Sequence, residues 1–459
     1  MMNTDLPLRV AIVGAGPSGF YAAEALLKAL PETRIDLIDR LPTPYGLVRG
    51  GVAPDHPKIK SVTKVFDRIA AHPTVRYLGN VEVGRDTTPD ELRAHYDAVI
   101  YAVGARTDRR LNIPGEDLPG SHAATELVGW YNGHPDYRGA SFDLTQTSAA
   151  VIGLGNVAMD VTRILSRRPE ELATTDIADH AARALAASRV HTVHVIGRRG
   201  PVQGAFTTPE LRELGELPGV DVVVDAADLE LDPVSLVRLE SGEDRTIQKN
   251  IEVLRGWSAR KRTGASRRIV FHFNASPVAL LGPDRVSGIT LVRNRLVADR
   301  RGDVRAEPTG QMVELPVGLV FRSVGYRGTA IPGLPFDVKR GVVPNQHGKV
   351  VEHEGSSTAV PGLYACGWIK RGPSGVIGTN KSCATETVEG LLADAMAGRI
   401  PLASRRESDL LTQLTDRAVT VTEWTDWQRL DALEIERGVP RGKPREKITA
   451  IREMLGAIR

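Results

Sequence analysis

Two short glycine motifs in this sequence have the residue types and spacing that bind a dinucleotide. The motifs are Gly14-x-Gly16-x-x-Gly19 and Gly153-x-Gly155-x-x-Ala158. Glycines at these positions let a chain turn sharply after a strand, and they let its backbone approach a pyrophosphate at the next helix N-terminus. One such motif is a weak signal, but two motifs that each follow an apolar run and precede a helix are a much stronger one. We therefore expect two dinucleotide sites.

The residues that follow the next strand differ in charge between the two motifs. After the first motif, a predicted strand over 34–38 ends at Asp39, whose carboxylate suits the free hydroxyls of a ribose. After the second, a predicted strand over 193–197 ends at Arg198 and Arg199, which suit a 2′-phosphate. The interval before Asp39 is near the usual one of about 20 residues, whereas the longer interval before Arg198 implies a longer crossover. The pattern predicts FAD at the first motif and NADP at the second.

Composition excludes several other classes of protein. The 459 residues suggest two or three domains, and 41% apolar with 25% charged residues is ordinary for a globular protein. A net charge of +3 is too small to indicate nucleic-acid binding, although it leaves room for a local basic patch. The first motif begins too early for a signal peptide to precede it, and no apolar run has transmembrane length. We expect a cytoplasmic enzyme.

The cysteine content indicates that the chain carries no second redox centre of its own. Only Cys366 and Cys383 are present, and they form no C-x-x-C pair. An internal iron–sulfur cluster usually needs four thiolates, so such a centre must lie on another protein. A redox-active disulfide of the thioredoxin-reductase kind also lacks its motif. Two thiols without a disulfide framework suit a reducing compartment, and no resident metal is expected.

The order of predicted elements indicates an α/β fold with two Rossmann-like, three-layer domains. A first βαβ unit over 8–39 is followed by an irregular loop over 41–57, rich in proline and glycine, and by a helix over 58–71. A second unit begins near residue 148, and a late strand–glycine–helix over 362–397 completes the first domain. We expect a discontinuous FAD domain (residues 1–107 and 326–459, ending in a helical extension) and an inserted NADP domain (residues 108–325).

Five segments together resemble the adrenodoxin-reductase family, and within it the NADPH–ferredoxin reductases of mycobacterial type. They are residues 14–21, 44–56, 153–160, 197–201 and 367–380. The proline-rich loop over 44–56 and the Gly-Trp-Ile-Lys-Arg-Gly-Pro motif from Gly367 are the specific ones. The resemblance runs from about residue 8 to residue 387 and is thinner over 221–316 and in the last 60 residues.

The resemblance implies a set of FAD contacts. Ser18 and the glycines of the first motif would lie by the pyrophosphate, and Asp39 by the ribose. The family often has Glu there; the shorter Asp makes a longer or water-mediated contact to the hydroxyl. The other implied residues line the flavin pocket (Leu47 and Val83), lie near the isoalloxazine (Trp368) or offer backbone to its polar edge (Gly375, Val376 and Ile377).

The resemblance also implies the NADPH contacts. Asn156 and Val157 would donate backbone groups near the pyrophosphate, beside Gly153, Gly155 and Ala158 of the second motif. Arg198 and Arg199 would hold the 2′-phosphate. Arg109, Glu210 and Gly375 would complete the nicotinamide side.

His56 and Glu210 are the candidate catalytic residues. The resemblance implies that both residues lie near the flavin and tune the balance of protons or charge during turnover. The alternative for His56 is a loop histidine that fixes local structure by hydrogen bonds, since hydride transfer from nicotinamide to flavin needs no protein acid. For Trp368 the alternative to a place near the isoalloxazine is a side chain that only packs.

The implied activity is transfer of a hydride from NADPH to FAD, and then of single electrons to a ferredoxin or a similar iron–sulfur protein. Because ferredoxins are usually acidic, we expect a transient electrostatic docking on a basic face. Two other classes stay open. One is an enzyme with another acceptor, such as a diaphorase, a monooxygenase or a subunit of a complex, and the other is a non-catalytic nucleotide-binding redox sensor.

Overall fold

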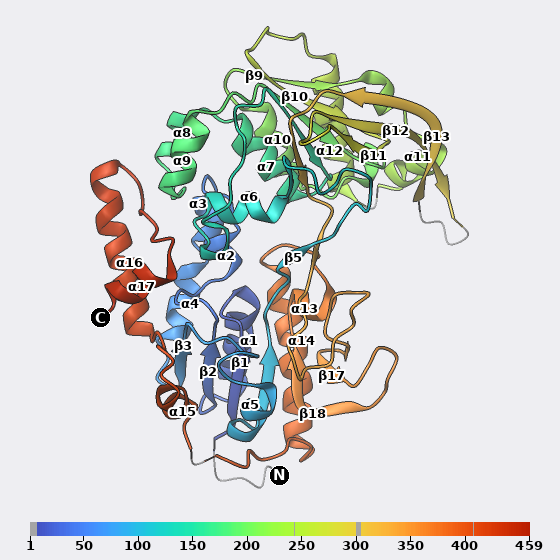
Figure 1. Cartoon of the computed structure of the whole chain (residues 1–459). Helices are drawn as coiled ribbons and strands as arrows, with labels where there is room; N and C mark the ends of the chain where they lie inside the picture. Colours follow the sequence, from blue (N-terminus) through green and yellow to red (C-terminus); the bar gives the residue numbers. More distant parts are fainter. Residues whose placement is uncertain (1–6, 243, 300–303, 407) are drawn as a thin grey trace. The chain divides into compact units, whose positions relative to one another are not determined.

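The protein divides into two compact units. The computed structural model describes residues 7–242, 244–299, 304–406 and 408–459 (Figure 1). Unit 1 comprises Met1–Thr107, Asn132–Pro135 and Gly325–Arg459, and unit 2 comprises Asp108–Tyr131 and Asp136–Val324. Unit 2 is thus inserted into a discontinuous unit 1. The chain passes from unit 1 to unit 2 after Thr107 and returns after Val324. The domain boundaries expected from the sequence follow residues 107 and 325.

Unit 1 is built on a seven-stranded sheet with the order β16-β17-β18-β4-β1-β2-β3. Its strands are β1 (Arg9–Val13), β2 (Arg34–Ile38), β3 (Val75–Leu78), β4 (Ala98–Tyr101), β16 (Asn345–Gln346), β17 (Lys349–Val351) and β18 (Ala359–Ala365). The strands from β18 to β3 are parallel, with β1 between β2 and β4. Val10 and Ile12 of β1 face one apolar core, and Ala11 and Val13 face another. A strand buried on both faces reads as a continuous apolar run, which is the signal in the sequence.

Helices cover both faces of this sheet. The helices of unit 1 are α1 (Pro17–Ala29), α2 (Leu47–Gly50), α3 (Pro57–Lys60), α4 (Thr63–Ala70), α5 (Pro89–His95), α13 (Trp368–Arg371), α14 (Thr379–Met396), α15 (Leu410–Asp416), α16 (Trp424–Gly438) and α17 (Ile451–Ala457), with the 3₁₀ turn η4 (Val439–Arg441). α1 and α14 lie side by side against the sheet (Figure 1). α16 packs on the same core through Trp427 and Leu430.

The single helix expected over 58–71 is instead two helices, α3 and α4. The break follows α3, where the Ser61 hydroxyl donates a 2.6 Å hydrogen bond to the Lys58 carbonyl. Serine side chains compete with the backbone for such carbonyls, which weakens the helix locally. The prediction of one continuous helix was therefore wrong.

Unit 2 is built on a six-stranded parallel sheet with the order β6-β14-β7-β8-β10-β9. Its strands are β6 (Ser121–Ala123), β7 (Ser148–Ile152), β8 (Thr192–Ile196), β9 (Val220–Val224), β10 (Arg267–His272) and β14 (Leu319–Arg322). The helical elements are α6 (Ala124–Tyr131), α7 (Asn156–Ser166), α8 (Pro169–Ala173), α9 (Asp179–Ala186), α10 (Thr208–Gly215), α11 (Pro233–Glu240) and α12 (Arg245–Ala259), with the 3₁₀ turns η1 (Pro135–Tyr137), η2 (Pro201–Gln203) and η3 (Ala226–Leu229). Two short strands, β5 (Thr107–Asp108) and β15 (Tyr326–Arg327), pair separately.

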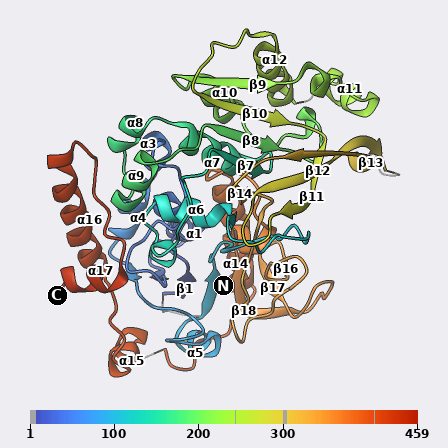
Figure 2. The same ribbon diagram turned by 45° about the horizontal axis from the view of Figure 1, so that its top comes forward.

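The two faces of the unit 2 sheet are covered by different layers. Val151 and Val193 face a core shared with the helices, whereas Ala150 and Ile152 face a core shared with a three-stranded antiparallel sheet. That sheet comprises β11 (Ala275–Leu281), β12 (Gly288–Ala298) and β13 (Val304–Leu315) and is visible in Figure 2. The two Rossmann-like domains are confirmed, but a sheet rather than a helical layer covers one face of the second.

The long interval before Arg198 also has a structural explanation. α8 and α9 lie in the crossover between α7 and β8, so the extra residues form two helices without displacing the strand. Across the described residues, the helices are too short or too polar to cross a membrane.

A pair of histidines lies on adjacent strands of the unit 2 sheet. Nδ1 of His194 on β8 is 2.9 Å from Nε2 of His272 on β10. Burial, together with the neighbouring His272 and Arg268, lowers the pKa of His194 to about 4. Burial also lowers the pKa of His272. Both rings are therefore neutral at neutral pH.

We expect the stability of unit 2 to fall with pH through this pair. Between pH 6.5 and about 4 the unfolded chain binds a proton at His194 that the folded chain does not, so the free energy of unfolding decreases as pH falls. The loss at pH 4.5 relative to pH 7 should be on the order of 2 kcal/mol. Calorimetry of the wild type and of His194→Gln measures it as the difference between their pH dependences. His353→Gln, at an exposed position, is the control, and equal slopes for wild type and His194→Gln would contradict the prediction.

Candidate functional site

The first glycine motif forms a crowded turn at the end of β1. Gly14 has φ +109°, and a Cβ there would lie 2.5 Å from the Ala102 carbonyl oxygen. A Cβ on Gly19 would lie 2.0 Å from the carbonyl oxygen of Gly14. Any side chain at either position would force the turn apart, so the glycines are required by the approach of one backbone to another.

The same turn leaves the N-terminus of α1 open. Gly16 is the N-cap and provides no side chain to accept from the helix. Among the described residues, the N–H groups of Ser18 and Gly19 have no acceptor. Unsatisfied N–H groups and the helix dipole together favour an anion at such an end.

The Ser18 side chain is bonded within unit 1. Its hydroxyl donates a 3.0 Å hydrogen bond to Oδ1 of Asn380 on α14. A Cβ on Gly367, which has φ +75°, would lie 2.1 Å from the Ser18 oxygen. The hydroxyl therefore ties α1 to α14 and lies close to the glycine after β18, and the backbone N–H of Ser18 stays available.

Both cysteines pack around this junction. The Cys366 thiol donates to the Ser18 carbonyl at 3.6 Å, and the Gly367 N–H donates to Sγ of Cys383 at 3.2 Å. Burial raises the pKa of the Cys366 thiol, and the neighbouring Cys383 adds to the rise. A buried thiol with a raised pKa is a poor nucleophile. Cys366 is thus suited to packing rather than to disulfide chemistry.

Asp39 holds the turn at the end of β2. Its Oδ2 accepts from the Ala15 N–H at 2.8 Å, and its Oδ1 accepts from the Leu41 N–H at 2.9 Å. Burial raises the pKa of this carboxyl, and the two backbone donors oppose that rise. Each carboxylate oxygen can accept a second hydrogen bond, so a ribose hydroxyl can share it.

The residues expected around a flavin ring include two exposed aliphatic side chains. Leu47 on α2 is 45% exposed and Val376 is 54% exposed. Trp368 is half-buried; its Nε1 donates to the Ser374 carbonyl at 3.2 Å, and its ring stacks on Tyr326 with centroids 5.4 Å apart. These are the apolar and aromatic surfaces that an isoalloxazine ring would cover. Val83 instead packs against the core of unit 1.

The backbone groups expected at the polar edge of the flavin are not all available. The Val376 N–H donates to Oγ1 of Thr379 at 3.1 Å. Among the described residues, the N–H groups of Gly375 and Ile377 have no acceptor. Gly375 has φ +79°, and a Cβ there would lie 2.6 Å from the Thr379 oxygen. The donors and surfaces of unit 1 therefore fit FAD, with two of the three expected N–H groups available.

The second motif repeats this geometry in unit 2. Gly153 has φ +140°, and a Cβ there would lie 2.2 Å from the Ser323 carbonyl oxygen. Gly155 is the N-cap of α7, and a Cβ on it would meet nothing within 4 Å. Oδ1 of Asn156 accepts from the Thr207 N–H at 2.8 Å, while its own N–H and that of Val157 have no acceptor among the described residues. Ala158, fully buried, packs against the core.

The loop after β8 carries two adjacent positive charges. Arg198 is exposed and Arg199 half-buried, and neither guanidinium has a hydrogen-bond or ion-pair partner among the described residues. Their carbonyls are held by the Asn294 side chain at 2.8 Å and by the Asn274 N–H at 3.1 Å. Burial lowers the pKa of Arg199, and the charges of Arg198 and Arg238 lower it further.

Arg238, on α11, was missed by the sequence analysis because it lies in the segment where the resemblance thins and no motif marks it. Its helix is tied to the turn after Arg199. Oγ of Ser235, one turn earlier on α11, accepts from Nε2 of Gln203 at 2.9 Å. Three cations around one loop, which form no ion pair with a carboxylate among the described residues, are suited to an anion.

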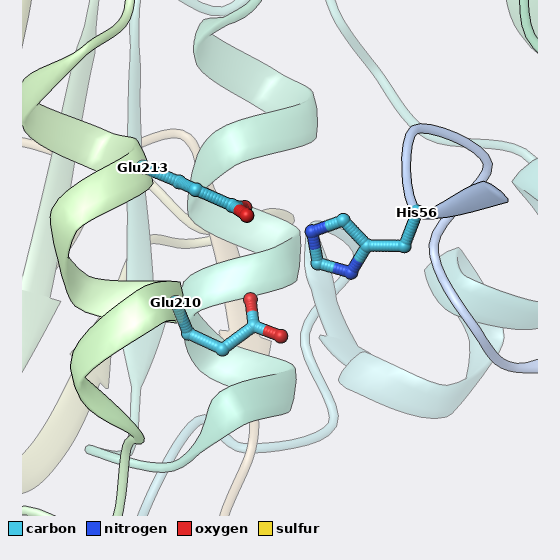
Figure 3. Close-up of side chains that lie close together, drawn as sticks. All are labelled: His56, Glu210 and Glu213. Carbon is cyan, nitrogen blue, oxygen red and sulfur yellow. The ribbon is translucent and has the colours of Figure 1, made fainter. Parts of the chain in front are cut away.

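Glu210 is part of a buried ion cluster in unit 2. Arg163 on α7 is fully buried and donates to Glu210 at 3.0 Å and to Asp160 at 2.6 Å. It also forms an ion pair with Glu213 at 3.3 Å. Glu210 and Glu213 both project from α10 (Figure 3). The cluster holds α10 against α7, beside the second glycine motif. Sequence reasoning missed Arg163, because a helical arginine gives no sign that it is buried.

The remaining candidates, His56 and Arg109, belong to different units. His56 belongs to unit 1, where it is the N-cap residue of α3 and its N–H donates to the Ala53 carbonyl at 3.1 Å. Arg109 belongs to unit 2 and is exposed, and its side chain has no hydrogen-bond or ion-pair partner among the described residues. The joint role expected for His56 and Glu210 stays a prediction.

Comparison with known proteins identifies close relatives. The model of the pyridine nucleotide-disulphide oxidoreductase family matches residues 8–227. The chain is 48% identical to the NADPH-ferredoxin reductase FprA of Mycobacterium tuberculosis, with 98% of both chains covered. It is 43% identical to the mitochondrial NADPH:adrenodoxin oxidoreductase of Arabidopsis thaliana, with 98% of this chain and 95% of that protein covered.

A solved structure agrees with these relatives. The structure of M. tuberculosis FprA in complex with NADPH matches this chain with a TM-score of 0.91 at 48% identity, over 98% of this chain and 99% of that one. A likeness at that identity and coverage extends through both units and through the C-terminal helices.

The Arg163 cluster yields a stability prediction. Arg163→Met should destabilise unit 2 by about 3–5 kcal/mol, because buried carboxylates would lose their guanidinium partner. Calorimetry or urea unfolding measures the change. Arg183→Met is the matched control, since Arg183 forms an exposed ion pair with Asp179 on a helix of the same unit, and it should cost less than about 1 kcal/mol. Equal losses in the two variants would contradict the assignment.

Proposed function

The chain belongs to the adrenodoxin-reductase family, and from that premise we propose that it is an FAD-containing reductase that takes electrons from NADPH and passes them to a ferredoxin or a similar iron–sulfur protein. One observation carries the proposal. Each unit has an open helix N-terminus at a glycine turn, with Asp39 beside the first and the unbalanced charges of Arg198 and Arg199 near the second. The two turns thus suit two different dinucleotides.

Unit 1 is proposed to hold FAD. The N–H groups of Ser18 and Gly19 bind the pyrophosphate, and Asp39 accepts from a ribose hydroxyl while it holds the turn. Leu47 and Val376 cover the ring and exclude water from it. FAD supplies the chemistry, because a flavin accepts a hydride and releases electrons singly.

The polar edge of the flavin is proposed to meet the N–H groups of Gly375 and Ile377. Trp368 lies close to the ring, held in orientation by Ser374 and Tyr326. Val83 supports this pocket from the core. The contribution of Val376 is its side chain, since Thr379 already accepts its N–H.

Unit 2 is proposed to hold NADPH. The N–H groups of Asn156 and Val157 bind the pyrophosphate, which can approach closely because nothing lies over Gly155. Arg198 and Arg199 bind the 2′-phosphate, and Arg238 adds a third positive charge. The other family positions, Arg109, Glu210 and His56, are proposed to serve the nicotinamide side and the charge balance of the reaction.

A surface of unit 2 suits an acidic electron-transfer partner. A pocket of about 530 Å³ between α10 and α12 is lined by Arg212, Arg245 and Lys249, none of which has an ion-pair partner among the described residues. Glu213 and Glu216 also line the pocket, so the net charge of its lining side chains is +1. We propose that this pocket is the contribution of unit 2 to ferredoxin docking. A cytoplasmic location is proposed as well, since the two buried thiols form no disulfide.

An anaerobic titration tests the function. NADPH added to the purified protein should bleach the flavin absorbance, NADH should do so more slowly, and a candidate acidic ferredoxin added afterwards should be reduced at a rate that falls with rising salt. Absence of flavin would contradict the proposal. Bound flavin that NADPH does not bleach would contradict it too and would favour a redox sensor. Oxygen uptake coupled to an organic substrate would indicate a monooxygenase instead.

The 2′-phosphate assignment has its own test. Arg198→Ala should raise KM for NADPH roughly 30-fold and change KM for NADH little, because a charge-assisted contact is worth on the order of 2 kcal/mol. Steady-state diaphorase kinetics with both nucleotides measure the two values. Arg295→Ala, which breaks an exposed ion pair with Glu307 in the same unit, is the control. An equal effect of Arg198→Ala on both nucleotides would refute the assignment.

A further inference from the structure

A buried carboxylate in the C-terminal segment is bound to a loop near the start of the chain. The side chain of Glu434 on α16 is 1% exposed, and that of Arg49 on α2 is 11% exposed. The two Arg49 Nη atoms donate to Glu434 at 2.8 and 2.5 Å, one to each oxygen. The Ile448 N–H donates to the same carboxylate at 2.9 Å. Paired bonds of this kind fix orientation as well as distance.

Other groups of the C-terminal segment hold the same short helix. The Arg49 guanidinium lies 5.2 Å above the Trp427 ring. Nζ of Lys447 donates to the Arg49 carbonyl at 3.4 Å. α2 has only four residues, too few to be stable by itself, so its place depends on these contacts.

The residues just before α2 are pressed against the first glycine motif. The Tyr45 N–H donates to the Ala15 carbonyl at 2.8 Å, and a Cβ on Gly46 would lie 3.0 Å from the Cα of Gly16. Tyr45 has φ +81°, which is unfavourable for a residue with a side chain. Such a backbone persists only where its surroundings hold it in place.

The C-terminal segment also supplies part of what holds Tyr45. Nε1 of Trp427 donates to the Tyr45 hydroxyl at 3.1 Å, and that hydroxyl donates to Asp67. Tyr45 and Trp427 are both buried, with ring centroids 5.5 Å apart. α16 therefore contacts the loop of residues 45–51 at both ends, through Trp427 at Tyr45 and through Glu434 at Arg49.

We propose that Glu434 is a positioning residue for FAD, which acts through Arg49 to hold the loop of residues 45–51 against the phosphate-binding turn. The inference rests on the proposed FAD site in unit 1, because Leu47 belongs to this loop and Ala15 and Gly16 belong to the turn. It assigns the C-terminal segment to the cofactor site, beyond its packing on the core.

A purely structural role would give a different result. If Glu434 only stabilised the fold, its loss would lower the melting temperatures of the FAD-free and FAD-loaded proteins equally and would leave the rate of FAD release unchanged. If it positions the loop, its loss weakens FAD binding, so FAD leaves faster and the difference between the two melting temperatures shrinks.

The experiment compares Glu434→Gln with Glu453→Gln in the full-length protein loaded with FAD. Glu453 is the matched control, since it forms an ion pair with Arg437 at 3.0 Å in the same segment with both partners close to half exposed. Recovery of flavin fluorescence measures FAD release, and thermal melts are recorded with and without FAD. We expect release about tenfold faster in Glu434→Gln and unchanged in Glu453→Gln.

Trp427→Phe is a second variant for the case that Glu434→Gln does not fold. It keeps an aromatic ring but removes the donor to Tyr45, and it should speed FAD release in the same direction. An unchanged release rate in the folded variants, with equal losses of melting temperature, would overturn the proposal. A wild-type protein that binds no FAD would refute the FAD site itself, which is a separate outcome.

Discussion

The close approach of one backbone to another at the ends of β1 and β7 is the constraint on which the rest of the structure depends. At Gly14 and Gly153 a side chain would collide with the carbonyl of a neighbouring strand-end loop, at Ala102 and at Ser323. Because no side chain intervenes, each turn passes directly into a helix whose first N–H groups stay open. Two helix N-termini suited to an anion therefore arise from backbone alone, and the side chains around them differ in charge.

Charge makes that distinction, and burial decides what each charge can do. Asp39 is held by two backbone donors, so its carboxylate has a fixed orientation. Arg198 and Arg199 have no such partners among the described residues, and their mutual repulsion favours an anion between them. Buried ions act differently. Arg163 and Glu434 are satisfied within the protein, and each fixes an element beside a glycine turn, α10 in unit 2 and α2 in unit 1.

The parts of the fold that could be predicted are those with a local signal. Apolar runs ending in glycine predicted β1, β7 and the helices after them, and the charges after the next strands predicted which dinucleotide each unit suits. The prediction of one helix over 58–71 failed because the Ser61 hydroxyl bonds to the Lys58 carbonyl, where α3 ends. The antiparallel layer on unit 2 was not anticipated, because a covering sheet and a covering helix leave the same apolar signal in the parallel strands they bury.

The sequence by itself determined the two glycine turns, their charges and the absence of a second redox centre, since these depend on residue type over a few positions. The tertiary structure decided which polar groups remain available. It showed that the Ser18 hydroxyl and the Val376 N–H are already paired, that Arg163 is buried, and that Glu434 binds Arg49 from the far end of the chain. Hydrogen bonds and ion pairs between residues distant in sequence depend on where the folded chain brings them together, and no local pattern records that.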